Sequence, residues 1–471
     1  MEIEEFRAAA HELVDWIADR RASVEGRPVR PAVAPRDIAN QLGSEPPSTP
    51  ESAADVLADL DAIVAPGITE VQHPMHFGWF PSNASLSSIL GDFASSGLGS
   101  LGISWESSPS LTEVEEVTVD WLRQLCGLSP DWRGVIQDTA STSCLVALLA
   151  ARERATNHNQ LRGGLVGFGR PLCVYTTDQA HSSVRKAALL AGFGADDIRL
   201  VATDPFSRDM NAAALAAAIE ADVFAGAVPA AVVASTGSTG VMAFDPLTEI
   251  VAAARRHDIW VHVDAAMAGS AMLLPEMRHL FHGIESADSI AWNPHKWMGT
   301  ILDCSLMYLR DPEHLVRVMS TNPSYLQTTT GLGTDAKEPT QFRDWGIPLG
   351  RRFRALKLWY QLRIDGIDAI QSRLRRDLEN AEWFAEQLEA REAWRVVAPV
   401  RLQTVCVRHV PADFTDAEVS EHNHTWVGEL NASGQAFLSP AMLDGQWMAR
   451  VSVGVEATER HHLERLLELL P

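Results

Sequence analysis

The spacing of apolar residues divides the chain into three regions, of which the first is helical at both ends. Residues 1–22 carry apolar side chains at helical spacing on one face, and residues 53–64 do so again. Six prolines between Pro28 and Pro50 predict a largely extended connection. Two helices joined in this way cannot enclose a core of their own, so we expect this segment to pack on other elements or on a second subunit.

From about residue 83, short β-like runs alternate with helical runs rich in Ala and Leu. Helices are expected over 143–154 and 248–256, and the expected strands are 134–136, 172–175, 230–234, 259–263 and 289–292. Alternation of this kind predicts an α/β domain around a mostly parallel central sheet with helices on both faces. Ligands of such sheets bind at the carboxyl ends of the strands, so the polar residues that follow each strand are the candidates for chemistry.

The last third of the chain has a different pattern. Residues 321–340 are rich in Thr, Gly and Pro, and their apolar residues follow neither the spacing of a helix nor that of a strand. This is typical of a long loop that closes over a site. Helices over 350–364 and 369–388, a strand over 403–407 and a closing helix from Glu459 indicate a small α+β domain. The expected organisation is an N-terminal helical segment (1–82), a large domain (83–352) and a small C-terminal domain (353–471).

Composition and charge narrow the class of protein. The chain has 471 residues, 46% of them hydrophobic, and a net charge of -22, which excludes disorder as the main state. No apolar run approaches the roughly 20 residues of a membrane span, and the N-terminus lacks a secretory pattern. Five cysteines without CxxC spacing favour reduced thiols in a cytoplasmic protein. The acidic balance disfavours nucleic acid and anionic membranes, so a small molecule is the expected partner.

Lys296 is the most informative residue for chemistry. It lies four residues after the expected strand 289–292, in the sequence Trp292-Asn-Pro-His-Lys-Trp297. Apolar surroundings disfavour the ammonium form of a lysine, and the neutral amine can form a Schiff base with a carbonyl. A lysine whose charged end reaches water is the alternative.

Three further positions follow other expected strands. Asp264, after 259–263, could hold the nitrogen of a pyridine cofactor protonated, or simply cap the next helix. Thr139-Ala140-Ser141 opens a helix and could bind a phosphate, or act as an ordinary N-cap. His181 could lie on an aromatic cofactor ring and transfer protons, or be a structural histidine.

Each signal is weak alone, but together they favour one cofactor. No metal-ligand spacing, Walker loop or serine nucleophile motif competes with them. A phosphate site, a histidine for the ring, a carboxylate for the pyridine nitrogen and an imine-forming lysine, in this order after successive strands, are what pyridoxal 5′-phosphate (PLP) requires.

Nearly the whole chain resembles the group II PLP-dependent decarboxylases, near the aromatic L-amino-acid decarboxylases and aromatic aldehyde synthases. The resemblance rests on these motifs: His73-Pro-Met-His-Phe77, Trp79-Phe-Pro81, Ser104-Trp-Glu-Ser-Ser-Pro109, Asp178-Gln-Ala-His-Ser-Ser183, His262-Val-Asp-Ala-Ala266, Asn293-Pro-His-Lys-Trp297 and Gly350-Arg-Arg-Phe-Arg354. It implies the fold of the aspartate-aminotransferase-like PLP enzymes (fold type I). It also implies a homodimer with active sites at the interface, in which the N-terminal segment wraps the partner.

The resemblance also implies roles for individual residues. Lys296 would bind the cofactor covalently, Asp264 would pair with the pyridine nitrogen and His181 would stack on the ring. The other cofactor-binding residues would be Thr139, Ala140, Ser141, Ser238, Ala266, Asn293 and His295. The substrate pocket would be lined by Trp79, Phe80, Pro81, Ser82, Leu101 and Ile103.

Two departures from the family pattern bear on the product and on selectivity. Phe342 is interpreted as occupying the position of a tyrosine in the mobile loop, which in the family is held to protonate the substrate carbon after CO2 leaves. Phenylalanine has no such proton, so this interpretation favours oxidative deamination to an aldehyde, with amine release as the alternative. Met267 replaces a tyrosine that is common in relatives, with no predicted consequence.

The expected function is therefore decarboxylation of a hydrophobic L-amino acid, with an aromatic side chain favoured and a bulky aliphatic one as the alternative. A transaminase would share the cofactor residues and need an arginine for the substrate carboxylate, for which Arg354 is the candidate. A protein without cofactor and without activity is the third alternative.

Overall fold

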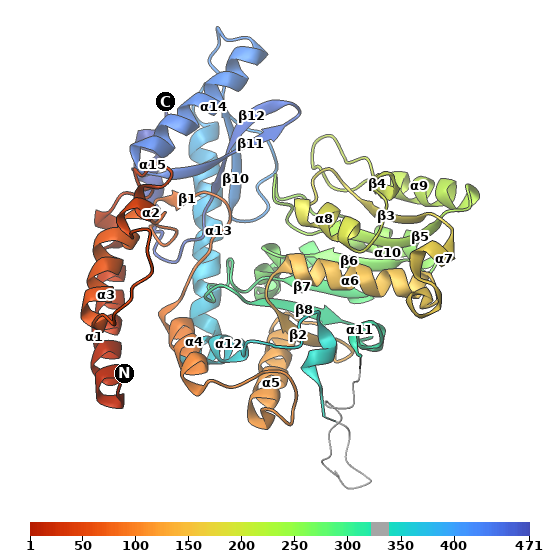
Figure 1. The fold of residues 1–471 in the computed structure, drawn as a ribbon. Helices are drawn as coiled ribbons and strands as arrows, with labels where there is room; N and C mark the ends of the chain where they lie inside the picture. Colours follow the sequence, from red (N-terminus) through yellow and green to blue (C-terminus); the bar gives the residue numbers. More distant parts are fainter. Residues whose placement is uncertain (322–338) are drawn as a thin grey trace. The chain divides into compact units, whose positions relative to one another are not determined.

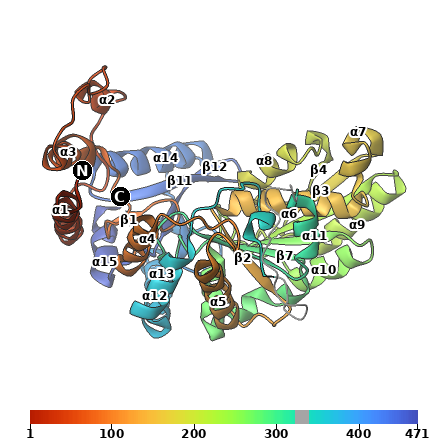
Figure 2. The ribbon, with the colours of Figure 1, turned by 60° about the horizontal axis from the view of Figure 1, so that its bottom comes forward.

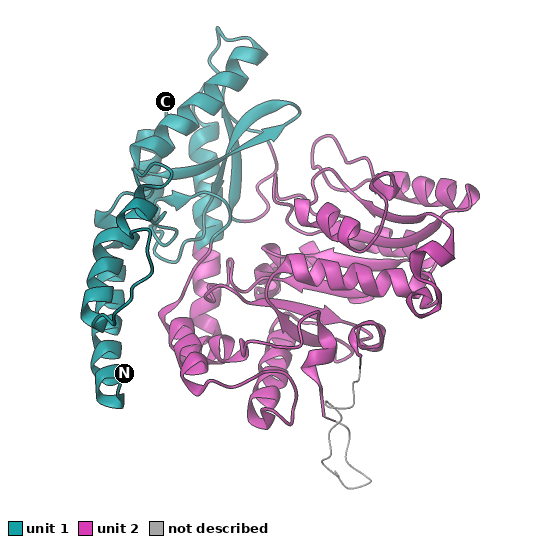
Figure 3. Ribbon diagram, viewed as in Figure 1, with its two compact units in different colours: residues 1–81, 377–397, 403–471 teal, residues 82–376, 398–402 magenta. Residues whose placement is uncertain are grey.

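The computed structural model describes residues 1–321 and 339–471, and the chain divides into two units (Figures 1 and 3). Unit 1 consists of residues 1–81, 377–397 and 403–471, and unit 2 of residues 82–376 and 398–402. The N-terminal segment thus shares a unit with most of the C-terminal part, while residues 353–376 belong to the larger unit. Most of the expected loop 321–340 lies outside the described residues.

Unit 2 is built around a seven-stranded sheet in the order β2-β8-β7-β6-β5-β3-β4. Only β8 runs antiparallel to its neighbours, so the expected mostly parallel sheet is confirmed. The strands are β2 (Arg133–Gln137), β3 (Leu172–Thr176), β4 (Ile198–Leu200), β5 (Val228–Ser235), β6 (Trp260–Asp264), β7 (Ser289–Trp292) and β8 (Ser305–Leu309). All five expected strands are present, and β4 and β8 are additional.

Helices cover both faces of this sheet, as Figures 1 and 2 show. Helices α6 (Ala140–Ala155) and α8 (Ser182–Leu190) lie on one face, and α9 (Ala212–Phe224) and α10 (Leu247–Arg255) lie on the other. This follows from right-handed crossovers, because the chain crosses the sheet in opposite directions before and after β4. The remaining helices are α4 (Leu86–Leu98), α5 (Pro109–Leu125), α7 (Gly164–Phe168), α11 (Glu313–Met319), α12 (Ala355–Ile364) and α13 (Ile367–Glu389), the last of which continues into unit 1.

The central strands are almost completely buried because helices lie on both sides of them. Every residue of β3 and β7 is buried, which explains why their sequences are continuous apolar runs without alternation. The core between α6, α8 and the sheet includes Val135, Leu148, Val174 and Val233. This rigid core fixes the carboxyl ends of the strands, where the polar residues predicted from the sequence lie.

Unit 1 contains a five-stranded sheet in the order β1-β11-β12-β10-β9. Its strands are β1 (His76–Phe77), β9 (Trp394–Val396), β10 (Thr404–His409), β11 (Phe437–Leu443) and β12 (Gln446–Ser452). Its helices are α1 (Ile3–Ala22), α2 (Asp37–Gln41), α3 (Ala53–Asp59), α14 (Asp416–Ser433) and α15 (Arg460–Leu469). The proline-rich connection is attached to the C-terminal part: Val29 is fully buried and its N–H donates to the Gly434 carbonyl at 2.8 Å.

Three general features of the described chain bear on the class of protein. None of its helices is long and apolar enough to cross a membrane. All five cysteines are buried, and none forms a disulfide. In the same part of the chain, no group of three or more His, Cys, Asp or Glu side chains could hold a metal ion.

Candidate active site

Asp264 lies at the centre of the candidate site, at the carboxyl end of β6. It is the last residue of that strand and pairs in register with Ser235 of β5 and Ala291 of β7. Its Oδ1 accepts a hydrogen bond from the Ala266 N–H at 3.0 Å, which orients the half-buried carboxylate. Ala266 in turn accepts a bond from the Asn293 N–H at 2.9 Å, so the turns after β6 and β7 are joined directly.

Lys296 follows β7 in a tight turn. Its N–H donates to the Asn293 carbonyl at 3.0 Å, and its own carbonyl accepts from the Gly299 N–H at 3.2 Å. The neighbouring Pro294 and Trp297 are buried, while Lys296 is half-buried. The structure therefore places Lys296 between buried chain neighbours, at the same sheet edge as Asp264.

His181 belongs to the same group of charges. It caps the N-terminus of α8, and its Nδ1 accepts the Ser183 N–H at 3.2 Å. Because a backbone N–H can only donate, the proton of the neutral ring must lie on Nε2. Burial lowers the pKa of His181, the Asp264 carboxylate raises it and the Lys296 ammonium lowers it. The three residues predicted to carry the chemistry are thus close enough for their charges to act on one another.

The N-terminus of α6 supplies the predicted phosphate site. Thr139 is the N-cap, and its N–H donates to the Asp138 carboxylate at 2.6 Å. In the first turn, the N–H groups of Ala140 and Ser141 have no partner within the helix, and the positive end of the helix dipole favours an anion there. The carboxylate of Asp138 next to this site was not predicted from the sequence.

Two buried polar atoms fit a bound cofactor. Within the described part of the chain, Asn293 Oδ1 and Thr236 Oγ1 are buried without a hydrogen-bond partner. Thr236 directly follows β5, and its N–H donates to the Asp264 carbonyl at 2.9 Å. Buried polar groups nearly always have a partner, so both are available to a ligand at this sheet edge. With the lysine, the carboxylate, the histidine and the helix N-terminus, the residues present fit PLP.

Ser238 and His295, two other predicted cofactor residues, are bound within their own turns. The Ser238 hydroxyl accepts the Ala243 N–H at 3.0 Å, closing the turn after β5. His295 is buried, and its Nδ1 accepts the Cys304 N–H at 2.9 Å. Sequence reasoning missed Thr236, whose hydroxyl has no motif to mark it, and the bond between His295 and Cys304.

The residues predicted to line the substrate pocket are divided between the units. Trp79, Phe80 and Pro81 belong to unit 1, and Ser82, Leu101 and Ile103 belong to unit 2. The backbone of Trp79 is in the left-handed region (φ 52°), and its N–H donates to Ser439 Oγ at 2.5 Å. The Ile103 carbonyl accepts the Arg343 N–H at 2.8 Å. Their role in substrate binding stays a prediction.

Phe342 lies just after the expected loop 321–340, and its role in catalysis stays a prediction. It begins a short 3-10 helix (Phe342–Trp345), is 2% exposed and belongs to the hydrophobic core of unit 2. The guanidinium of Arg351 lies 4.9 Å from the centre of its ring, and Trp345 meets it edge-on. Phenylalanine fits this position because the surroundings are apolar and aromatic.

Arg354 is already bound to a carboxylate of its own unit. Its Nε and Nη2 donate to the two oxygens of Asp303 at 2.8 and 3.1 Å. An arginine held in this way is a poor receptor for a substrate carboxylate. Arg354, the residue that would bind the substrate carboxylate in a transaminase, is therefore already part of a structural ion pair.

The comparisons with known proteins agree with this geometry. Residues 35–410 match the pyridoxal-dependent decarboxylase conserved domain. Over the full length of the chain, it is 37% identical to tryptophan decarboxylase 2 of Oryza sativa subsp. japonica, covering 94% of that protein, and 35% identical to phenylacetaldehyde synthase of Arabidopsis thaliana, covering 96%. The crystal structure of Oryza sativa TDC with PLP and tryptamine superposes with a TM-score of 0.95 at 36% identity, over 100% of this chain and 97% of that one. The chain therefore belongs to the family of PLP-dependent decarboxylases, as the resemblance in its sequence implied.

Proposed function

We propose that the protein decarboxylates an aromatic L-amino acid and releases the amine. The observation that carries this proposal is the grouping of Lys296, Asp264 and His181 at the carboxyl ends of β7, β6 and β3, on the same sheet that α6 follows at β2. When bound, PLP supplies a protonated pyridine ring that accepts the electrons left on the substrate carbon as CO2 departs.

Each residue of the group has a distinct task in this proposal. Asp264 holds the proton on the ring nitrogen, because an ionised carboxylate at hydrogen-bond distance favours the cationic form of its partner. Lys296 binds the cofactor covalently, the first turn of α6 binds its phosphate, and Asn293 and Thr236 supply polar groups beside it. His181, neutral with its proton on Nε2, lies at the same edge to orient the substrate and exchange a proton with it.

The aromatic substrate class is supported by two kinds of observation. Tryptophan decarboxylase 2 and phenylacetaldehyde synthase, named for aromatic compounds, match the chain over its whole length. Trp79 and Phe80 follow the His73–Phe77 motif, and aromatic side chains in that position suit a flat substrate ring. Valine and leucine are the aliphatic alternatives that an experiment must include.

Release of the amine is supported by the position of Phe342. A side chain packed in the core beside Arg351 is not placed to exchange protons with a substrate, whether it is Phe or Tyr. A tyrosine elsewhere in the chain could donate this proton. Two of the four tyrosines, Tyr175 and Tyr308, are buried with their hydroxyls bonded to Asp222 and Val119. Tyr325 lies in the sequence 321–340, whose composition is typical of a loop that closes over a site. Aldehyde release stays the second candidate, because phenylacetaldehyde synthase is among the relatives.

We also propose a cytoplasmic homodimer. In unit 2, Leu86, Leu90 and Phe93 of α4 are 56%, 49% and 47% exposed at helical spacing, and in unit 1 the apolar face of α1 exposes Ile3 and Phe6. Apolar stripes of this kind are usually covered in an assembled protein. Light scattering should give twice the mass of the chain, and Leu90→Glu combined with Phe93→Glu should shift it towards the monomer.

The direct test is a substrate panel. Purified protein with PLP is incubated with phenylalanine, tyrosine, tryptophan, DOPA, valine and leucine, and CO2, amine, aldehyde and peroxide are measured. We expect CO2 and amine in equal amounts from at least one aromatic substrate, without peroxide. Release of peroxide and aldehyde would select the second candidate, and transfer of the amino group without CO2 would contradict decarboxylation.

A further inference from the structure

The buried histidine beside the cofactor lysine exists in a single protonation form. His295 is 5% exposed, and its Nδ1 accepts the Cys304 N–H at 2.9 Å. A backbone N–H cannot act as acceptor, so Nδ1 carries the lone pair and the only ring proton lies on Nε2. Burial lowers the pKa of His295 to about 4, and the Lys296 charge acts in the same direction, so the ring is neutral at physiological pH.

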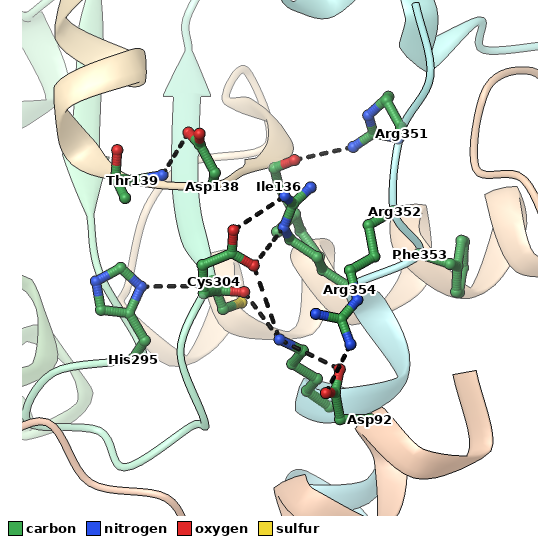
Figure 4. A network of polar contacts seen from close by, with 12 residues as sticks. Asp92, Ile136, Asp138, Thr139, His295, Cys304, Arg351, Arg352, Phe353 and Arg354 are labelled. Carbon is green, nitrogen blue, oxygen red and sulfur yellow. Dashed lines mark hydrogen bonds and ion pairs between the residues drawn. The ribbon is translucent and has the colours of Figure 1, made fainter. Parts of the chain in front are cut away.

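The Cys304 N–H, which selects the Nε2–H form of His295, belongs to a segment that charged side chains hold in place. Asp303, which precedes Cys304, accepts two hydrogen bonds from Arg354 through its carboxylate. Its carbonyl accepts a third bond from Lys357 Nζ at 3.1 Å. Lys357 is fully buried, and its Nζ also lies 3.3 Å from Asp92 Oδ1. Figure 4 shows the continuous series of contacts from Asp92 to His295.

Such a network is hard to explain by stability alone. Moving two cations and two carboxylates out of water costs free energy that their attraction only partly offsets, and apolar residues of similar size are often no less stable. What ionic contacts provide instead is a defined geometry. Here they define the position of one backbone segment, residues 303 and 304. Cys304 of this segment makes two hydrogen bonds to His295: its N–H donates to Nδ1 at 2.9 Å, and its carbonyl accepts the His295 N–H at 3.4 Å.

We propose that Asp303, Arg354 and Lys357 are positioning residues, which keep His295 as a neutral Nε2–H donor for the phosphate of PLP. The inference rests on the cofactor role of the site. It assigns no contact with the cofactor to the three residues themselves, because they act through Cys304 and His295. In this arrangement His295 adds a hydrogen bond to the phosphate without adding a cation next to Lys296, whose amine must lose its own charge to react.

The first experiment measures PLP affinity by equilibrium dialysis, in the absence of substrate. Loss of a hydrogen bond to a charged group predicts that Arg354→Gln and Lys357→Met raise the PLP dissociation constant roughly tenfold or more. The conservative variant Arg354→Lys should restore part of the affinity. The matched control is Arg363→Gln, which removes an exposed arginine of the same helix, α12, that has no contact with Asp92 or Asp303 and should leave the affinity unchanged.

A double-mutant cycle separates positioning from general loosening of the fold. In the background His295→Gln, the change Arg354→Gln should cause little further loss of PLP affinity, because the donor it positions is already gone. Equal losses in both backgrounds would overturn the proposal. Should Arg354→Gln fail to fold, as judged by circular dichroism, the same cycle is run with Arg354→Lys.

The second experiment observes the histidine itself. In protein labelled with ¹⁵N-histidine, the Nδ1 and Nε2 resonances of His295, identified by their absence in His295→Gln, should report the Nε2–H form between pH 8 and 6. In Lys357→Met and Arg354→Gln they should move to the averaged values of an exchanging ring. Unchanged resonances would overturn the proposal even if affinity fell. Binding of PLP without CO2 release from any substrate would instead contradict the proposed function. The double-mutant cycle would still test the positioning of His295, because it measures PLP affinity and not activity.

Discussion

Glu115 and Arg351 form a buried ion pair in unit 2, with 2.7 Å between Oε1 and Nη2. Their side chains are 0% and 7% exposed. The same Oε1 accepts the Ile136 N–H at 3.0 Å, and Arg351 donates to the carbonyls of Ile136 and Gly102 at 2.9 and 3.0 Å. The pair therefore connects α5 and the segment before α12 to β2, the strand that leads into the phosphate site.

The first prediction concerns the stability that this pair contributes. Glu115→Gln leaves the buried guanidinium of Arg351 without a counter-charge, which should cost about 3 kcal/mol and lower the thermal midpoint by several degrees. The control is Arg352→Gln, whose ion pair with Asp92 lies at the surface and should contribute less than about 1 kcal/mol. Equal midpoints for the two variants, measured by calorimetry, would contradict the prediction.

The second prediction concerns Lys296 and the covalent attachment of the cofactor. Borohydride reduction of the holoenzyme followed by peptide mapping should find the pyridoxyl group on Lys296. Lys296→Ala should lose this label and lower the rate of CO2 release by roughly a thousandfold or more, because Lys296 is the lysine that lies beside Asp264 and His181 and supplies the amine. Lys186→Ala, on α8 of the same unit, is the matched control and should retain both. A label found on another lysine would refute the assignment.

The third prediction tests the carboxylate at the end of β6. Asp264→Asn keeps the hydrogen bond to the Ala266 N–H but cannot hold the cofactor ring protonated. We expect kcat to fall by roughly 10² to 10⁴-fold, with a much smaller change in PLP affinity. Asp178→Asn, an exposed residue after β3, should leave kcat unaltered. A loss confined to KM would show that Asp264 binds substrate instead.

Much of this site could be predicted from the sequence because its residues follow strands whose apolar runs are unmistakable. The runs 259–263 and 289–292 are completely buried, so the sequence predicts Asp264 and Lys296 after two core strands, and the structure has both at a common sheet edge. The bond between Cys304 and His295 could not be predicted, because it depends on where an antiparallel strand, β8, enters the sheet. The burial of Phe342 could not be predicted for a related reason: a polar, aperiodic sequence gives no sign that one of its side chains packs into the core.

The fourth prediction separates the two candidate products. Phe342→Tyr places a hydroxyl in the core beside Arg351 and should cost about 1 to 3 kcal/mol of stability without changing the product. Tyr325→Phe removes the one tyrosine of the segment 322–338 and should lower amine yield while aldehyde and peroxide rise. Both variants are assayed by mass spectrometry of products and by peroxide release. A rise of amine yield in Phe342→Tyr would restore the interpretation made from the sequence.

The fifth prediction concerns the loss of stability in acid. His262 is fully buried in β6, with Nδ1 2.8 Å from Ser289 Oγ, and burial lowers its pKa to about 4. In the unfolded chain a histidine has a pKa near 6.5, so between these values the unfolded state binds a proton that the folded state does not. Stability is therefore complete above about pH 6.5 and falls as the pH drops towards 4, by up to about 3 kcal/mol for this residue.

Comparison of thermal midpoints at pH 7.5 and 5.0 tests the sign of this effect. Wild-type protein should be clearly less stable at pH 5.0, with His76 and His295, whose pKa values burial also lowers to about 4, contributing in the same direction. His262→Gln removes one of these contributions, so it should start less stable at pH 7.5 and lose less on acidification. His279→Gln, at an exposed position, should follow the wild type. An identical pH dependence for His262→Gln and wild type would mean that His262 is already protonated in the folded protein, in conflict with its burial.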